Sequence, residues 1–195
     1  EQEQIFICTH GRHDKCCAKF GQELADKMRY HVSKQKTAVE VWESSHLGGH
    51  RFAPTMIDFP AGRAYGQLSP DEITKFLECR KVGQVYGSAY RGSVFLSDLE
   101  QVAEAHIQHY CSARNWFCRV QINKLEKITE ERFRCIATFS TIKNSVVSQS
   151  NIPEEQLFSF KLKSFESPSR CDDVEGPQLR KCWELDSPIP HNHLL

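Results

Sequence analysis

The chain lacks the features that would assign it to several large functional classes. Its 25 basic and 25 acidic residues leave no net charge, so the composition gives no indication of nucleic-acid binding. No apolar run approaches the roughly 20 residues that a membrane-spanning helix needs, and the first residues, EQEQ, have neither the basic stretch nor the apolar core of a signal peptide. Dinucleotide-binding Gly-x-Gly-x-x-Gly and P-loop patterns are missing as well. We therefore expect a soluble protein with no nucleic-acid and no membrane partner.

Cysteine, by contrast, is abundant. The chain has nine cysteines, an odd number that cannot all pair within one molecule. Their scatter through strand-like and helix-like stretches does not resemble a small secreted disulfide scaffold. We expect a reducing compartment, the cytoplasm or another such as a plastid stroma, in which most cysteines are small core residues.

The first part of the chain follows an α/β pattern. The expected elements are a strand at 5–7, an amphipathic helix at 18–31, a strand at 37–42, a hairpin of strands 55–59 and 63–68, and a helix at 73–81. Pro60 and Gly62 supply the hairpin turn, while Ser69 and Pro70 are typical of a helix start. This order predicts a thioredoxin-like layer in which loops at the C-terminal ends of neighbouring strands carry the chemistry.

The second part differs in character. Residues 86–93 are predicted to be a Gly-rich connector, and residues 98–113 an amphipathic helix. Strand-like patterns follow, at 117–122, 133–139 and 157–165, and then a loop over 170–183 that leads to a last short strand. The expected organisation is a domain over residues 1–92 and a C-terminal α+β region with antiparallel strands over residues 93–195.

Two loops of the first domain concentrate potential metal ligands. Cys8 follows the first strand, and Cys17 lies at the start of the first helix, where the positive end of the helix dipole favours a thiolate. His46 and His50 follow the second strand and are close enough to share a metal. Thiolates and imidazoles together suit a transition metal or a cluster. Cys16 competes with Cys17 for the role of ligand.

Other side chains near these loops have candidate supporting roles. Gly48 and Gly49 would let the backbone approach a bulky ligand closely. His10 is a candidate for contacting or replacing a ligand, as is His13. Arg12 and Arg51, which lie on the two ligand-bearing loops, could donate hydrogen bonds to a cofactor or meet an acidic redox partner.

The residues Cys8-Thr9-His10-Gly11, Asp14-Lys15-Cys16-Cys17-Ala18 and the stretch 41–55, with its His46-Leu47-Gly48-Gly49-His50, resemble the sucrase/ferredoxin-like family. That family is related to the thioredoxin-like [2Fe-2S] ferredoxins. The hairpin Phe59-Pro60-Ala61-Gly62 matches theirs, and the two histidines stand where those ferredoxins have a second cysteine pair. The resemblance is specific over residues 5–71 and looser beyond.

The resemblance implies a [2Fe-2S] cluster held by Cys8, Cys17, His46 and His50, and it favours Cys17 over Cys16. It implies a one-electron carrier and not an enzyme. Neutral imidazoles reduce the negative charge of a cluster, and in Rieske centres this moves potentials from about −400 mV to roughly −150 to +300 mV. Because a ligating imidazole can lose its second proton, the potential should also depend on pH.

The residues themselves leave two alternatives to an iron–sulfur electron carrier. Two cysteines and two histidines also make a structural or regulatory zinc module. A thiol-disulfide oxidoreductase would suit the fold, but Cys-x-x-Cys is absent. The redox donor and acceptor proteins leave no motif, and the second half of the chain could dock a partner or form a homodimer.

Overall fold

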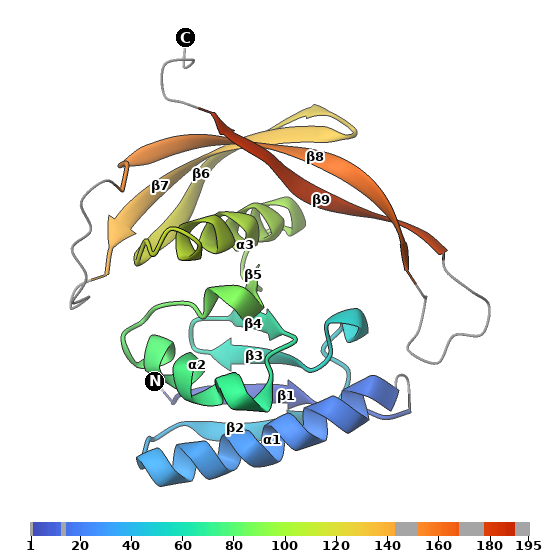
Figure 1. Cartoon of the computed structure of the whole chain (residues 1–195), viewed down its shortest axis with the longest axis vertical. Coiled ribbons are helices and arrows are strands. Elements are labelled where there is room, and N and C mark those ends of the chain that lie inside the picture. Colours follow the sequence, from blue (N-terminus) through green and yellow to red (C-terminus); the bar gives the residue numbers. More distant parts are fainter. Residues whose placement is uncertain (1, 13–14, 143–151, 168–177, 190–195) are drawn as a thin grey trace.

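The computed structural model describes residues 2–12, 15–142, 152–167 and 178–189, which form two β-sheets and three α-helices (Figure 1). The strands and helices of the first part are β1 (Gln4–Cys8), α1 (Lys15–Gln35), β2 (Glu40–Ser44), β3 (Thr55–Phe59), β4 (Arg63–Gly66), α2 (Ile73–Lys81) and β5 (Tyr90–Ser93). Those of the second part are α3 (Asp98–Ser112), β6 (Cys118–Thr129), β7 (Arg132–Thr141), β8 (Glu155–Ser167) and β9 (Gln178–Ile189). Short 3-10 turns lie at His50–Phe52, Pro70–Glu72 and Gly87–Ala89.

The first sheet has the strand order β2-β1-β3-β4-β5. Strands β1 and β2 are parallel and are linked by α1, whereas β3, β4 and β5 are added antiparallel. Helix α1 packs on β1 and β2, and α2 packs on α1. Ile5 and Ile7 of β1 are fully buried in the core between this sheet and the helices. This arrangement confirms the predicted α/β fold with a thioredoxin-like layer.

Two helix starts follow from side-chain capping. Ser69 and Glu72 form a capping box at the turn that leads into α2, and Ser97 and Glu100 form a second one at α3. Each box satisfies backbone N–H groups that have no partner within the helix. Both helices therefore begin close to the predicted positions, and α3 ends within one residue of the prediction.

The Gly-rich segment before α3 is an edge strand, and the prediction of a connector was wrong for its second half. Strand β5 pairs with β4, with Tyr65 opposite Tyr90. Gly92 has a φ of 93°, and a Cβ there would lie 2.5 Å from the backbone oxygen of Gln101 in α3. Glycine at this position lets β5 approach α3. Because glycine has a low strand propensity, the sequence pattern did not predict a strand here.

The second sheet is antiparallel, with the order β6-β7-β8-β9, and arches over α3 (Figure 1). Its core joins Ala103 and Ile107 of α3 to Phe133, Phe158 and Phe160 of the sheet, all fully buried. The rings of Phe133 and Phe160 are stacked with centroids 4.5 Å apart. The predicted C-terminal region with antiparallel strands is therefore confirmed.

Strand β9 corrects the prediction of a loop that ends in a short strand. It spans Gln178–Ile189 and pairs along its length with β8, so that Trp183 lies opposite Leu162. The Trp183 ring packs edge-on against Phe133 at 4.8 Å. Long-range pairing with β8 stabilises a segment whose own sequence alternates poorly, which is why local patterns missed it. Cys171, one of the nine cysteines, lies outside the described residues.

Three cysteines of the second region are core residues, in line with the prediction for most cysteines, whereas Cys182 is exposed. Cys111, Cys118 and Cys135 are all buried. Burial raises the pKa of the Cys135 thiol to about 12, so it stays protonated and unreactive at neutral pH. Among the described helices, none combines the length and the apolar character needed to cross a bilayer.

Candidate metal centre

The two predicted ligand loops leave the sheet at the same edge. Strands β1 and β2 run parallel with Cys8 directly opposite Ser44, so both strands end side by side. One residue further on, the Thr9 N–H donates a hydrogen bond to the Ser44 carbonyl oxygen at 3.1 Å. His46 follows two residues after Ser44. The register of these parallel strands therefore brings the first cysteine and the first histidine to neighbouring positions.

The N-terminus of α1 reaches the same edge because the helix packs closely on the end of β1. A Cβ at Gly21 would overlap the backbone carbonyl of Cys8, so only glycine allows this approach. The first turn of α1 contains no acidic residue that would oppose a thiolate. Cys16 and Cys17 consequently lie at the positive end of the helix dipole, over the C-terminal end of the strand that carries Cys8.

The adjacent cysteines of α1 have different surroundings. Cys17 is 1% exposed and Cys8 is fully buried, whereas Cys16 is half-buried. The Cys16 thiol donates to the backbone carbonyl of His50 at 3.8 Å. This contact joins the helix start to the second loop through Cys16, the competing candidate, whereas Cys17, the predicted ligand, is buried.

The second loop makes a tight turn between the two histidines. Gly48 and Gly49 have φ values of 81° and 64°, a backbone conformation that favours glycine. Nothing lies within 4 Å of the position that a Gly48 Cβ would take, so this side of the loop is open. His46 is exposed and His50, at the start of the 3-10 turn, is half-buried. Both histidines are thus more exposed than Cys8 and Cys17.

The four side chains are brought to one edge but are not assembled into a ligand set. Within residues 2–12, 15–142, 152–167 and 178–189, no three His, Cys, Asp or Glu side chains are grouped so that they could hold a metal ion. The donor types nevertheless fit an iron–sulfur cluster, since thiolates and imidazoles are its ligands. The Nδ1 atom of His10, in the first loop, is buried without a hydrogen-bond partner. Such an atom costs about 1–3 kcal/mol unless a group bound beside it supplies a partner.

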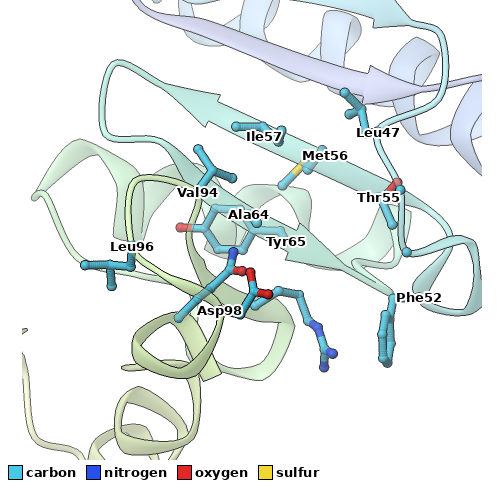
Figure 2. Close-up of a pocket in the computed structure, with 14 residues that line it drawn as sticks. Leu47, Phe52, Thr55, Met56, Ile57, Ala64, Tyr65, Val94, Leu96 and Asp98 are labelled. Carbon is cyan, nitrogen blue, oxygen red and sulfur yellow. The ribbon is translucent and has the colours of Figure 1, made fainter. Parts of the chain in front are cut away.

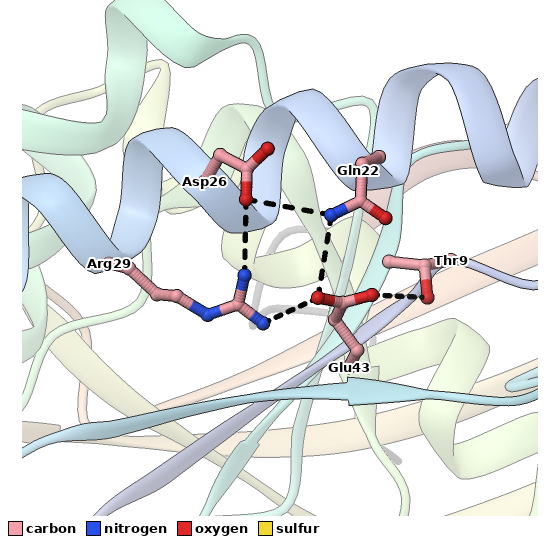
Figure 3. A network of polar contacts seen from close by, with 5 residues as sticks. All are labelled: Thr9, Gln22, Asp26, Arg29 and Glu43. Carbon is pink, nitrogen blue, oxygen red and sulfur yellow. Dashed lines mark hydrogen bonds and ion pairs between the residues drawn. The ribbon is translucent and has the colours of Figure 1, made fainter.

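A polar network that sequence reasoning missed ties the first loop to α1 and β2 (Figure 3). Glu43 accepts hydrogen bonds from Thr9 at 3.1 Å, from Gln22 at 3.4 Å and from Arg29 at 2.7 Å. Arg29 also pairs with Asp26 at 3.1 Å. The hydrogen bond from Arg29, helped by those from Gln22 and Thr9, lowers the pKa of Glu43. Glu43 thus holds the start of the cysteine loop and the start of the histidine loop in register.

The supporting side chains differ in accessibility. Arg12 and Arg51 are both exposed on the two loops, where a partner could reach them. His13 lies outside the described residues.

The close approach of α1 to β1 at Gly21 could have been predicted from the sequence, because a glycine inside an amphipathic helix pattern commonly marks a close approach of backbone. No spacing in the sequence indicates the network around Glu43.

The N-terminal part of the chain is similar to a known protein family. The sucrase/ferredoxin-like family model matches residues 1–92. This match confirms, for residues 1–92, the resemblance drawn from the loop motifs.

Two yeast proteins are similar to the same part. Each is named altered inheritance of mitochondria protein 32. The one from Debaryomyces hansenii is 27% identical over 99 residues, which is 48% of this chain and 36% of the relative. The one from Clavispora lusitaniae is 26% identical over 95 residues, 47% of this chain and 35% of the relative. The chain thus spans about a third of the length of the curated relatives it matches.

Among solved structures, a thioredoxin-like [2Fe-2S] ferredoxin from Aquifex aeolicus aligns at 16% sequence identity with a TM-score of 0.44. The alignment covers 48% of this chain and 94% of that one. A structure of the wild-type thioredoxin-like [2Fe-2S] ferredoxin from the same organism aligns with a TM-score of 0.42 over 46% of this chain and 96% of that one.

Proposed function

We propose that this protein is a one-electron carrier whose [2Fe-2S] cluster is held by Cys8, Cys17, His46 and His50. The observation that carries the proposal is the convergence of the two loops. Parallel strands place Cys8 beside the start of the histidine loop, and the Cys16 thiol contacts the His50 carbonyl at 3.8 Å. The sucrase/ferredoxin-like match covers both loops and supports the same reading.

Each part of the loop cluster has a role that its surroundings support. Cys8 and Cys17 are buried, so their thiolates would hold the inner side of the cluster away from water. His46 is exposed and His50 is half-buried, so they would hold the outer side. The cluster supplies the one-electron chemistry when it is bound. An exposed imidazole can exchange its second ring proton with water, and this proton exchange would make the reduction potential depend on pH.

The polypeptide itself would then act as a carrier between proteins and not as an enzyme. The exposed Arg12 and Arg51 flank the two loops and would attract an acidic partner surface. We propose a protein donor and a protein acceptor, with no nucleic-acid or membrane partner. Dimer formation would be a further role for the second half of the chain. The proposed compartment is a reducing one; the names of the yeast relatives add a mitochondrial setting to the cytoplasm and the plastid stroma as candidates.

Metal and sulfide analysis of the purified 195-residue chain tests this proposal. We expect about two iron atoms and two sulfides per chain and a red-brown protein. Cys17→Ser should abolish the cluster, whereas the matched variant Cys16→Ser should retain it. A colourless protein with one zinc ion would establish the zinc module instead. Loss of the cluster in Cys16→Ser with retention in Cys17→Ser would transfer the ligand role to Cys16.

A further inference from the structure

A pocket of about 410 Å³ opens beside the histidine loop (Figure 2). Leu47, Gly48 and Gly49, which lie between the two histidines, form one of its walls. Strands β3 and β4 and the segment before α3 form the others, with the apolar side chains Ile57, Ala64, Val94 and Leu96 drawn around it. The volume lies in the range of small-molecule sites, which typically have about 300–1,000 Å³. A molecule that enters this pocket would touch the loop on which both predicted histidine ligands lie.

The pocket contains a cation without a neutralising partner. The guanidinium of Arg91 lies 3.5 Å from the ring centroid of Phe52, stacked on the aromatic face. Within the described part of the chain, no carboxylate lies within ion-pairing distance of Arg91. Arg91 is an exposed residue, and the partial burial of its guanidinium lowers its pKa. Arginine remains charged under all ordinary conditions, so its N–H groups are available to an oxyanion.

A second polar group in the same pocket also lacks a partner. The hydroxyl oxygen of Thr55 is buried and makes no hydrogen bond. Thr55 is 8% exposed and lies at the start of β3, next to the wall formed by Gly49. A buried hydroxyl without a partner costs about 1–3 kcal/mol. An oxygen or nitrogen atom of a bound molecule would remove that cost.

We propose that this pocket binds a small organic anion, whose carboxylate, sulfonate or phosphate group pairs with Arg91 and whose apolar body lies against Ile57, Val94 and Leu96. The planar guanidinium offers two parallel N–H donors to such a group, and its stacking on Phe52 holds it in place. The Asp98 carboxylate lines the same pocket and is exposed. It disfavours highly charged anions, so a singly charged anion with a substantial apolar part fits the site best.

Fluorescence titration with 1-anilinonaphthalene-8-sulfonate tests the proposal, because this probe joins an aromatic body to one sulfonate. The neutral analogue N-phenyl-1-naphthylamine has the same body without the charge. We expect one saturable sulfonate site per chain, about tenfold weaker in Arg91→Gln, since charge-assisted hydrogen bonds contribute about this much. The neutral probe should bind both forms equally.

Arg114→Gln is the matched control. Arg114 also lies 3.5 Å from an aromatic ring centroid, that of Tyr110, but it does not line the pocket. Sulfonate binding to this variant should stay within twofold of the unchanged chain. Equal binding by Arg91→Gln and Arg114→Gln would overturn the proposal, as would several weak sites per chain.

Backbone NMR locates the site without relying on Arg91. Addition of the sulfonate should shift the amide signals of Gly48 and Gly49 and leave those of β8 unchanged. Shifts in the β8 signals without shifts at Gly48 and Gly49 would also overturn the proposal. The fluorescence titration is run on the chain without an iron–sulfur cluster and on the chain that contains one. Its outcome is therefore independent of the proposed electron-transfer function.

Discussion

The buried ion pair beneath the first sheet gives a prediction whose size and pH dependence both follow from the structure. Asp58 of β3 lies opposite Ile5 of β1 and is 3% exposed at its side chain. Arg80 of α2, 10% exposed, donates from its Nε to the Asp58 carboxylate at 2.9 Å. Arg80 also reaches Glu3 at 2.8 Å, but that carboxylate is 49% exposed and contributes little. Arg80→Ala therefore removes the cation that is hydrogen-bonded to the buried Asp58 carboxylate and leaves only the weaker influence of the Arg63 charge.

The expected loss of stability is about 3–5 kcal/mol, the usual cost of removing one partner from a buried ion pair. For a chain of this length, that corresponds to a decrease in Tm of roughly 6–20 °C. Arg134→Ala is the matched control, since the Arg134–Glu126 pair has a similar distance of 2.8 Å but is 48% and 45% exposed. The free energy of unfolding of this control should fall by no more than about 1 kcal/mol.

The loss of stability caused by Arg80→Ala should also depend on pH. Burial raises the pKa of Asp58 above 3.8, although Arg80 opposes the shift. A folded-state pKa above the unfolded one means that the folded protein binds more protons in that interval, so this group favours folding at low pH and loses that contribution as the pH rises through its folded pKa. Removal of Arg80 raises the folded pKa further. The cost of Arg80→Ala should therefore be largest at neutral pH and shrink as the pH falls towards 4.

Urea unfolding of both variants and the unchanged chain at several pH values between 4 and 8 measures these effects. The double variant Asp58→Asn/Arg80→Ala should recover part of the stability that Arg80→Ala loses, because the uncompensated charge is gone. An Arg80→Ala cost below about 1 kcal/mol, or one that does not change with pH, would refute the assignment of Asp58 as a buried ionised group.

Three glycine substitutions give further predictions. Gly21→Ala should lower the Tm and the iron content per chain, although alanine gains about 1 kcal/mol of helix propensity, because its Cβ would push α1 away from Cys8. An increase in Tm with full iron content would contradict the close helix–strand approach. Gly92→Ala should cost more stability in thermal unfolding than Gly48→Ala, since both have a positive φ but only the first meets backbone, the Gln101 oxygen at 2.5 Å. Equal costs would mean that β5 does not pack on α3 as described.

Local patterns were enough for the elements whose own residues determine them. The capping boxes that begin with Ser69 and Ser97 predict the starts of α2 and α3, and the turn at Pro60–Gly62 predicts the β3–β4 hairpin. The parallel strands that place the two ligand loops could also be predicted, because a strand–helix–strand unit brings strand ends to one edge. The positions of both loops therefore followed from the sequence.

Elements that depend on distant partners could not be predicted in the same way. Strand β9 forms because β8 offers a full-length edge, and β5 forms because Gly92 fits against α3. The network around Glu43 joins residues from three elements and leaves no fixed spacing in the sequence. The pocket beside the histidine loop is likewise assembled from segments that meet only in the folded chain, including Arg91.

Pulsed EPR of the dithionite-reduced protein tests the central claim most directly, because it detects nitrogen bound to iron. The account predicts a [2Fe-2S] signal with strong couplings to two ¹⁴N nuclei in the unchanged chain, one of which is lost in His46→Cys and one in His50→Cys. A reduced cluster without ¹⁴N coupling would contradict the assignment of the histidines as ligands. A protein that binds zinc and gives no EPR signal would contradict the electron-carrier function itself.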